Sequence, residues 1–285
     1  MIYRMRFIYT DEAGIAANEP VTVVVGIIVN ADTQWVPTVG RIFELLKTVP
    51  EKFRDEFVFH ATSIWADHKY RPNWSFEARL EFLKRMMSIP RESGLPITYG
   101  MFYRDGTINP DVNLTELKMT REQYQHVHAF EACMASADDY INTYAAVNEI
   151  SVIVAEDIPE MRQRLREATI QLRTGGLTIK KALVTRQVQG KTVSTSARPA
   201  AMQIRRVVDD IHFSPKVSAL ILWVADAVAY GLRRYYATLP FGVDFAQAIM
   251  GPTFDPIARE KDCAAGYMCN DPPTENPFAT PIGSC

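Results

Sequence analysis

The chain alternates short, strongly apolar segments with longer segments of helical spacing, which is the pattern of an α/β protein. Residues 21–29 (VTVVVGIIV) are β-branched almost throughout and predict a strand covered on both faces. A shorter strand is predicted at residues 7–10, and the connection between the two is short enough for an antiparallel hairpin. Further strands are predicted at residues 97–103, 149–155 and 207–213.

Apolar positions at helical spacing predict helices at residues 39–49, 74–87, 119–147 and 159–173. Thr120 and Gln123 have the spacing of a capping box at the start of the third helix. Pro159 suits the first turn of the fourth helix. A last long helix is predicted to begin at Ser214 and Pro215 and to run to residue 236.

Two segments depart from this pattern. Residues 177–195 alternate apolar and polar positions around a central Gln-Gly pair, which predicts a hairpin inserted at about residues 174–200. Beyond residue 239 prolines recur, so we expect one short helix at 241–250 and an extended or disordered tail from about residue 261. The expected organisation is one α/β domain over residues 1–238 and a Pro-rich, partly irregular C-terminal extension over 239–285.

Composition places the chain among globular proteins, with 47% hydrophobic and 22% charged residues in 285. The net charge of −2 gives no overall basic field, but residues 160–216 hold twelve Lys or Arg against four Asp or Glu. This basic segment is either a solvated helix face with an exposed hairpin or a surface that binds the phosphates of a nucleic acid. Its candidate nucleic-acid-binding residues are Arg162, Arg166, Lys180, Lys181, Arg205 and Arg206.

Several protein classes are not supported by the sequence. The four cysteines show no zinc-binding spacing, and the N-terminal residues do not resemble a secretory signal. No apolar run reaches the length of a membrane span, so we expect a cytoplasmic protein with reduced thiols and no membrane partner. P-loop, dinucleotide-binding and serine-hydrolase motifs do not occur.

The candidate chemistry lies in acids that follow two strands and in one acid of the last helix. Asp11 and Glu12 end the first predicted strand, and Glu156 and Asp157 end the strand at 149–155. Adjacent strand residues point to opposite faces, so we expect one ligand from each pair. Asp11 and Asp157 are preferred, with Glu12 and Glu156 as alternates. Asp226 is surrounded by apolar or small residues, and its charge requires a cation or strong hydrogen-bond donors.

If these three acids converge, their hard oxygen ligands favour Mg²⁺ or Mn²⁺. Two such ions, about 3.5 to 4 Å apart, would activate a water and stabilise the leaving oxygen in phosphodiester hydrolysis. Alternatively, Asp226 is a structural acid that pairs with Arg233 or a backbone donor. His60 follows a short apolar, strand-like pattern and either transfers a proton or contacts a phosphate, or is structural.

These residues together resemble a bacterial family. Asp11-Glu12-Ala13-Gly14 resembles the D-E-S-G signature of domain-of-unknown-function family 3800, and Phe59-His60-Ala61 resembles its F/L-H-A segment. Residues 211–213 followed by 225–230 (ADAVAY) resemble its closing pattern, so the resemblance covers about residues 5 to 238. Two positions depart from it, because Ala13 replaces the usual Ser and Trp223 the usual Gln.

The resemblance implies a ribonuclease H-like fold: a mixed five-stranded sheet flanked by helices, with acids on the first strand, a middle strand and a late helix. It implies Asp11, Glu156 or Asp157, and Asp226 as those acids. The leading expectation is therefore metal-dependent hydrolysis of RNA or DNA. One alternative is a non-catalytic nucleic-acid- or protein-binding module, in which protein donors satisfy Asp226 and Asp11 lies too far away to share an ion. Another is a hydrolase of a small phosphorylated molecule, which predicts a closed pocket.

Overall fold

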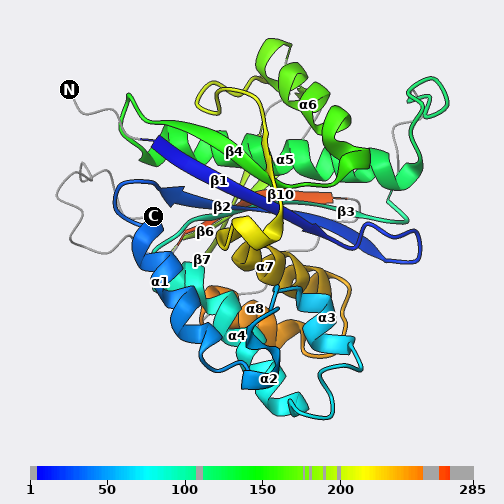
Figure 1. Cartoon of the computed structure of the whole chain (residues 1–285). Helices are drawn as coiled ribbons and strands as arrows, with labels where there is room; N and C mark the ends of the chain where they lie inside the picture. The colour runs from blue at the N-terminus through cyan, green and yellow to red at the C-terminus, as the bar shows by residue number, and fades with distance from the viewer. Residues whose placement is uncertain are drawn as a thin grey trace.

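A mixed β-sheet forms the centre of the molecule (Figure 1). The computed structural model describes residues 5–106, 112–175, 177–179, 182–188, 191–197, 200–252 and 263–269, with the side chains of 177–202 left out, and of 263–269 only that of Met268 included. Five strands run in the order β3-β2-β1-β4-β9. They are β1 (Met5–Ala13), β2 (Val21–Asn30), β3 (Ile97–Tyr103), β4 (Ile150–Glu156) and β9 (His212–Ser214). β2 is antiparallel to β1 and β3, whereas β4 is parallel to β1 and β9, which confirms the predicted mixed five-stranded sheet.

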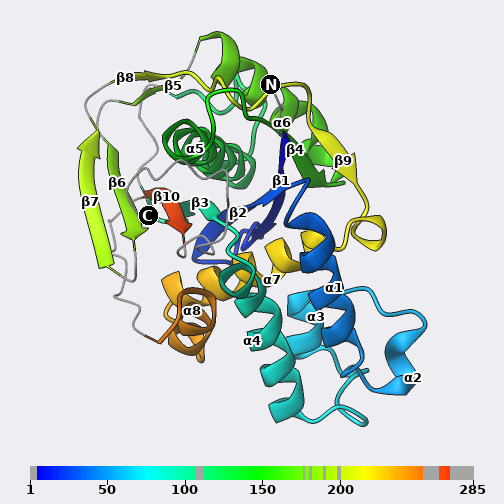
Figure 2. The same ribbon diagram turned by 90° about the vertical axis from the view of Figure 1, so that its left-hand side faces the viewer.

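The sheet continues beyond β3 into one strand from the last part of the chain and two from residues 182–197 (Figure 2). β10 (Cys263–Cys269) pairs antiparallel with β3, and β6 (Ala182–Val188) pairs parallel with β10. β6 and β7 (Lys191–Ala197) form the predicted antiparallel hairpin. β5 (Leu177–Ile179) and β8 (Ala200–Met202) form a separate pair at its base. Thus part of the segment expected as an irregular tail is a sheet strand that joins the hairpin to β3.

Helices cover both faces of the sheet, because side chains of both faces of β1 and β2 are apolar. In Figure 1, α5 (Arg121–Tyr144) and α6 (Pro159–Thr174) lie above the sheet. α4 (Phe76–Glu92), α7 (Ile221–Tyr236) and α8 (Gly242–Met250) lie below it. Every residue of β2 is buried, and two separate apolar cores form, one on each face. No helix in the described part of the chain is both long enough and apolar enough to cross a bilayer.

The remaining helices, α1 (Trp35–Leu46), α2 (Glu51–Arg54) and α3 (Ala61–Ala66), lie on the same side as α7. The prediction of a short strand before His60 was wrong, because residues 57–60 form no strand and His60 is the N-cap residue of α3. The apolar pattern reflects core packing instead of a strand. The rings of Phe57 and Phe59 pack on those of Phe82 and Trp223, with centroid distances of 5.9 to 6.3 Å.

Helix starts were predicted with unequal success. At α5, Thr120 and Gln123 form the predicted capping box. The last long helix, α7, begins at Ile221 instead of near Ser214, because a 3-10 turn, η1 (Lys216–Ser218), comes first.

The strand predicted at residues 207–213 is shorter than expected. Only its end forms β9, preceded by one isolated bridge between Val207 and Ser151. Asp209 has a positive φ of 65°, which interrupts the extended backbone. Before it, a carboxylate oxygen of Asp138 accepts hydrogen bonds from three successive backbone N–H groups, those of residues 205 to 207.

Two glycines provide a test of how closely α5 packs on the sheet. A Cβ on Gly100 of β3 would lie 2.1 Å from the carbonyl oxygen of Ala129 and 2.9 Å from the backbone nitrogen of Cys133. We expect Gly100→Ala to lower the free energy of unfolding by about 3 kcal/mol, because α5 would have to move. A Cβ on Gly40 of α1 would meet no neighbouring atom within 4 Å, so Gly40→Ala should raise that free energy by about 0.5–1 kcal/mol.

Urea denaturation of both variants beside wild type measures the two effects. Equal stabilities of Gly100→Ala and wild type would contradict the contact between α5 and β3.

Candidate functional site

Three carboxylates converge on one lysine ammonium at the edge of the sheet. Lys216 Nζ lies 2.9 Å from Asp11 Oδ2, 2.8 Å from Glu156 Oε2 and 2.9 Å from Asp226 Oδ2. The side chain of Lys216 is 8% exposed, and Asp11 and Asp226 are also buried. We call these four residues the carboxylate cluster.

Strand pairing explains why two of these acids meet. β1 and β4 are parallel neighbours, and Tyr9 and Thr10 pair with Val154 and Ala155. Extending this register by one residue sets Asp11 beside Glu156, with both side chains on the face that α7 covers. α7 packs on β1 and β2, and its buried second turn brings Asp226 to the same point. The prediction that Asp11 and Asp226 lie close together is therefore met by the geometry.

Lys216 is the member of the cluster that the sequence interpretation missed. It follows Pro215 directly after β9, and its backbone carbonyl accepts a 2.9 Å hydrogen bond from Nε1 of Trp223. Trp223 stands one helical turn before Asp226, at the position where the resembled family usually has Gln. The need of Asp226 for a cation was a signal that could have found Lys216, which precedes it by ten residues. Arg233, the partner proposed from the sequence, instead binds Glu19 at 2.6 Å.

The cluster is crowded with like charge. Burial raises the pKa of Asp11 well above its ordinary value; Lys216 acts against this, and Asp226, Glu12 and Glu156 add to it. Burial alone would lower the pKa of Lys216, but the attraction of Asp11, Asp226 and Glu156 outweighs it and raises that pKa. Asp11 Oδ2 is buried and has no hydrogen-bond partner among the described residues, although the ammonium lies 2.9 Å away. Lys216 therefore supplies charge to this oxygen without a properly aligned hydrogen bond.

Glu12 points to the other face of β1, as expected for the neighbour of Asp11. Its Oε2 lies 3.7 Å from Nε2 of His126 in α5, and its backbone N–H donates to Asp11 Oδ1 at 2.8 Å. Burial, with a further contribution from Glu156, raises the pKa of Glu12 to about 8. Burial also lowers the pKa of His126 to about 4, so this histidine is neutral at pH 7. Glu12 thus adds a fourth acid close to the cluster without contacting the ammonium.

His60 lies at the exposed side of the cluster. Its Nδ1 is 3.4 Å from Lys216 Nζ and 3.5 Å from Asp226 Oδ2. The imidazole is 47% exposed, whereas Lys216 beside it is buried. A histidine in this position can exchange protons between solvent and the cluster.

The preference for Asp157 over Glu156 is corrected by the geometry. Glu156 contacts Lys216, whereas both oxygens of Asp157 bind the guanidinium of Arg162 in the first turns of α6. This Arg162 contact lowers the pKa of Asp157. Asp157 follows the last residue of β4, so its side chain points to the face opposite Glu156.

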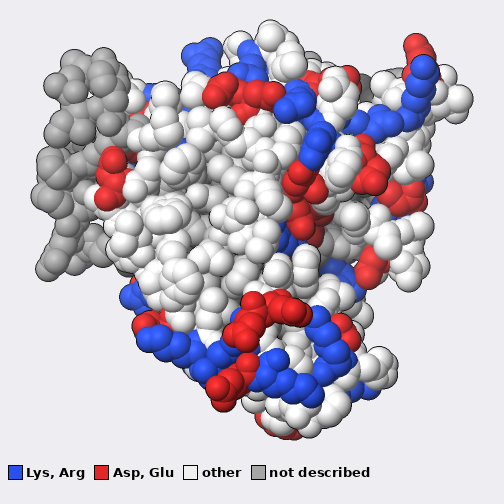
Figure 3. Space-filling view, in the orientation of Figure 1, with Lys and Arg blue, Asp and Glu red and all other residues white. Residues whose placement is uncertain are grey.

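The basic residues expected to hold nucleic acid are scattered or already paired. Arg162 binds Asp157, and Arg166 lies 2.9 Å from Asp210 with its guanidinium over the ring of Phe213. Lys180 and Lys181 lie outside the described residues. In Figure 3, basic and acidic side chains are interspersed on the visible face, and no continuous basic patch covers it.

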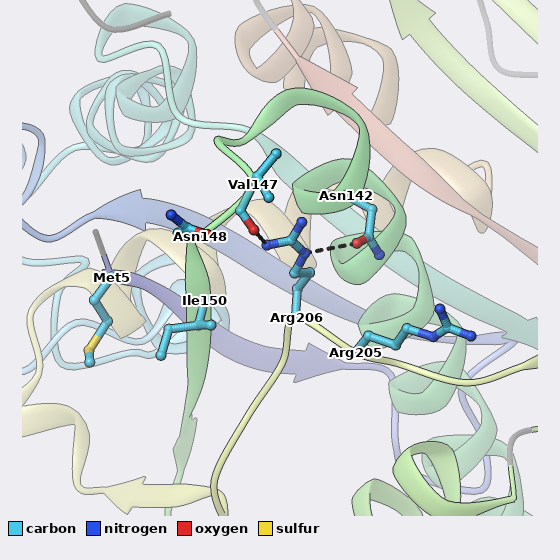
Figure 4. Close-up of a pocket in the computed structure, with 7 residues that line it drawn as sticks. All are labelled: Met5, Asn142, Val147, Asn148, Ile150, Arg205 and Arg206. Atoms are coloured by element: carbon cyan, nitrogen blue, oxygen red, sulfur yellow. Dashed lines mark hydrogen bonds between the residues drawn. The ribbon is translucent and has the colours of Figure 1, made fainter. Parts of the chain in front are cut away.

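Arg205 and Arg206 line a cleft of about 670 Å³ far from the cluster (Figure 4). The cleft includes Met5 and Ile150, the first residues of β1 and β4, whereas Asp11 and Glu156 lie toward the other ends of these strands. Arg206 donates to Asn142 and to the backbone carbonyls of residues 147 and 149. The structure therefore does not bring Arg205 and Arg206 to the carboxylate cluster.

The donors of the cluster fit a divalent cation in their chemistry and charge. Three carboxylate oxygens surround one cation position, and Asp11 Oδ2 retains an unused hydrogen-bonding lone pair. No group of three or more His, Cys, Asp or Glu side chains in the described ranges is already arranged to hold a metal ion. The oxygens converge and yet form no ready metal site, because the Lys216 ammonium occupies the point where the three oxygens meet. Asp11, Glu156 and Asp226 could hold Mg²⁺ or Mn²⁺ if Lys216 moved.

Comparison with protein-family models gives no match for this chain, and the search of curated proteins gives none either.

Removal of the ammonium provides a test of the charge balance in the cluster. We expect Lys216→Met to lower the free energy of unfolding of the metal-free protein by about 3–5 kcal/mol, because buried carboxylates lose their counterion. Lys84→Met is the matched control, since Lys84 pairs with Asp244 at the surface, and it should change stability by less than about 1 kcal/mol. Denaturation in EDTA measures both. Equal effects of the two substitutions would contradict the ion pairing described for Lys216.

Proposed function

We propose that the protein is a metal-dependent nuclease that hydrolyses phosphodiester bonds of RNA or DNA. The observation that carries this proposal is the convergence of Asp11, Glu156 and Asp226 on one cation position at 2.8 to 2.9 Å. Three acids drawn from two strand ends and a helix have no evident packing role, and their burial costs free energy. Such an arrangement is typical of a site that binds a cation for chemistry.

The charge balance supports a divalent ion at this position. One ammonium contacts three carboxyl groups, and burial raises the pKa of Asp11 well above its ordinary value, so a single positive charge compensates the ionised cluster incompletely. Carboxylate oxygens are the ligands that Mg²⁺ and Mn²⁺ prefer. When bound, such an ion activates a water and stabilises the leaving oxygen. Asp11, Glu156 and Asp226 would hold it, and His60 at the exposed side would exchange the proton with solvent.

The strand order supports the proposed relation to ribonuclease H-like proteins. The order β3-β2-β1-β4-β9, with β2 antiparallel to its neighbours, agrees with the fold that the resemblance to domain-of-unknown-function family 3800 implies. Membership of that family and the nuclease activity are both proposals, and the second follows partly by analogy of fold. We further propose a cytoplasmic location, which suits the free thiol of Cys133.

A non-catalytic binding module is the second candidate, because one of its two expectations agrees with the structure. Lys216 donates a 2.9 Å hydrogen bond to Asp226, so a protein donor satisfies this acid. The other expectation, that Asp11 lies too far from Asp226 to share an ion, disagrees with the shared contact to Lys216 Nζ. A hydrolase of small phosphorylated molecules predicts a closed pocket at the cluster, whereas the cleft of about 670 Å³ lies at the first residues of β1 and β4.

Cleavage of labelled single- and double-stranded RNA and DNA, with Mg²⁺, Mn²⁺ or EDTA, tests the nuclease proposal. We expect metal-dependent cleavage that falls at least about 100-fold in Asp11→Asn, Glu156→Gln and Asp226→Asn, because each loses one oxygen ligand charge. Asp157→Asn is the matched control and should retain activity, since Asp157 pairs with Arg162 outside the cluster.

Circular dichroism of each variant establishes that the fold is intact. Absence of cleavage by wild type on all four substrates would reject the nuclease and favour the binding module. Loss of activity in Asp157→Asn but not in Glu156→Gln would reverse the assignment of the middle ligand.

A further inference from the structure

The side chain of Lys216 is placed as an internal cation. Its ammonium lies among Asp11, Glu156 and Asp226, and the whole side chain of Lys216 is only 8% exposed. The backbone at this residue is held in place, because Trp223 donates to its carbonyl and the 3-10 turn continues to Ser218. The four-carbon stem between the fixed backbone and the ammonium is flexible.

We propose that Lys216 is a displaceable counterion, which partly compensates the charge of the three carboxyl groups while no divalent ion is bound and leaves them when such an ion enters. The inference rests on the metal site of the proposed function and assigns it a built-in competitor. It predicts that the net free energy of metal binding is the free energy gained by coordinating the ion minus the free energy needed to release the ammonium.

Two cations cannot share this position. The ammonium contacts all three oxygens at 2.8 to 2.9 Å, and Mg²⁺ would require the same oxygens at about 2.0–2.1 Å. Positive charges so close together repel strongly in a buried site. Entry of the ion therefore requires Lys216 to withdraw.

The ammonium is also an incomplete partner for the cluster. Asp226 receives a hydrogen bond from it, but Asp11 Oδ2 has none and is buried. A divalent ion carries twice the charge and imposes no hydrogen-bond direction, so it can bind all three oxygens at once. The exchange is thus favoured electrostatically for the carboxylates, and its cost is the relocation of Lys216.

The side of the cluster that His60 covers is the one nearest to solvent. Nδ1 of this histidine is 3.4 Å from Lys216 Nζ, and its imidazole is 47% exposed to solvent. We expect the lysine stem to swing out on this side while the backbone stays bound to Trp223.

Calorimetric titration of Mn²⁺ into wild type and Lys216→Met tests the competition directly. We expect the dissociation constant to be at least about tenfold lower in Lys216→Met, because the competing charge is absent. Lys84→Met, which removes a surface lysine paired with Asp244, should bind Mn²⁺ as wild type does. An unchanged or weaker affinity in Lys216→Met would overturn the proposal.

Reductive methylation of the wild-type protein, followed by mass spectrometry, provides a test that does not depend on the variant's folding. Lys216 should react slowly in EDTA and about tenfold or more faster with saturating Mn²⁺, if the ion shifts it from bound to free. Lys84 serves as the internal reference. A rate for Lys216 that stays constant or falls when Mn²⁺ binds would overturn the proposal.

These results separate the inference from the nuclease function. Displacement of Lys216 by Mn²⁺ without cleavage of any nucleic acid would uphold the counterion and reject the nuclease. Metal-dependent cleavage with Lys216 equally protected in EDTA and Mn²⁺ would uphold the nuclease and reject the counterion. No Mn²⁺ binding by either wild type or Lys216→Met would overturn the counterion proposal, and the cleavage assay would still decide the nuclease.

Discussion

The structure depends on how acidic side chains are buried at the end of β1. Asp11 and Glu12 are adjacent, point to opposite faces of the sheet and are both covered by helices. Burial raises the pKa of each carboxyl group, and the nearby acids raise it further. Such a site can be stable only if protons remain on some of the acids or if cations compensate them. Lys216 is the compensating charge that the chain itself provides.

The packing around the cluster supports this arrangement. Trp223 holds the backbone of Lys216 through its indole N–H, while its ring stacks on Phe59 with centroids 6.3 Å apart. Phe59 directly precedes His60, so the same apolar contact positions both the ammonium and the imidazole. Arg233, the next basic residue along α7, is bound to Glu19. The apolar core on this face of the sheet thus determines which cation reaches the carboxylates.

Most of the fold could be predicted because its signals are local. The β-branched run of β2 and the capping box of α5 each lie within a few residues of the element they define. β9 and β10 were harder, since β9 keeps only three residues of the predicted strand after the turn at Asp209, and β10 is identified by pairing with β3. Lys216 was missed for a related reason, because its partner Asp11 lies 205 positions earlier in the chain and nothing in the local sequence connects them.

The choice between Glu156 and Asp157 shows how strand register decides chemistry. Both residues are acids at the end of β4, and neither composition nor spacing distinguishes them. The register does, because Glu156 still pairs with Ser214 of β9 and lies on the same face as Val154, which is paired with Tyr9 of β1. Asp157 is one residue further along the chain, and its side chain points toward α6, where it pairs with Arg162. The inward acid is therefore selected by the pairing of three strands distant in sequence, and the outward acid becomes the partner of the helix that follows.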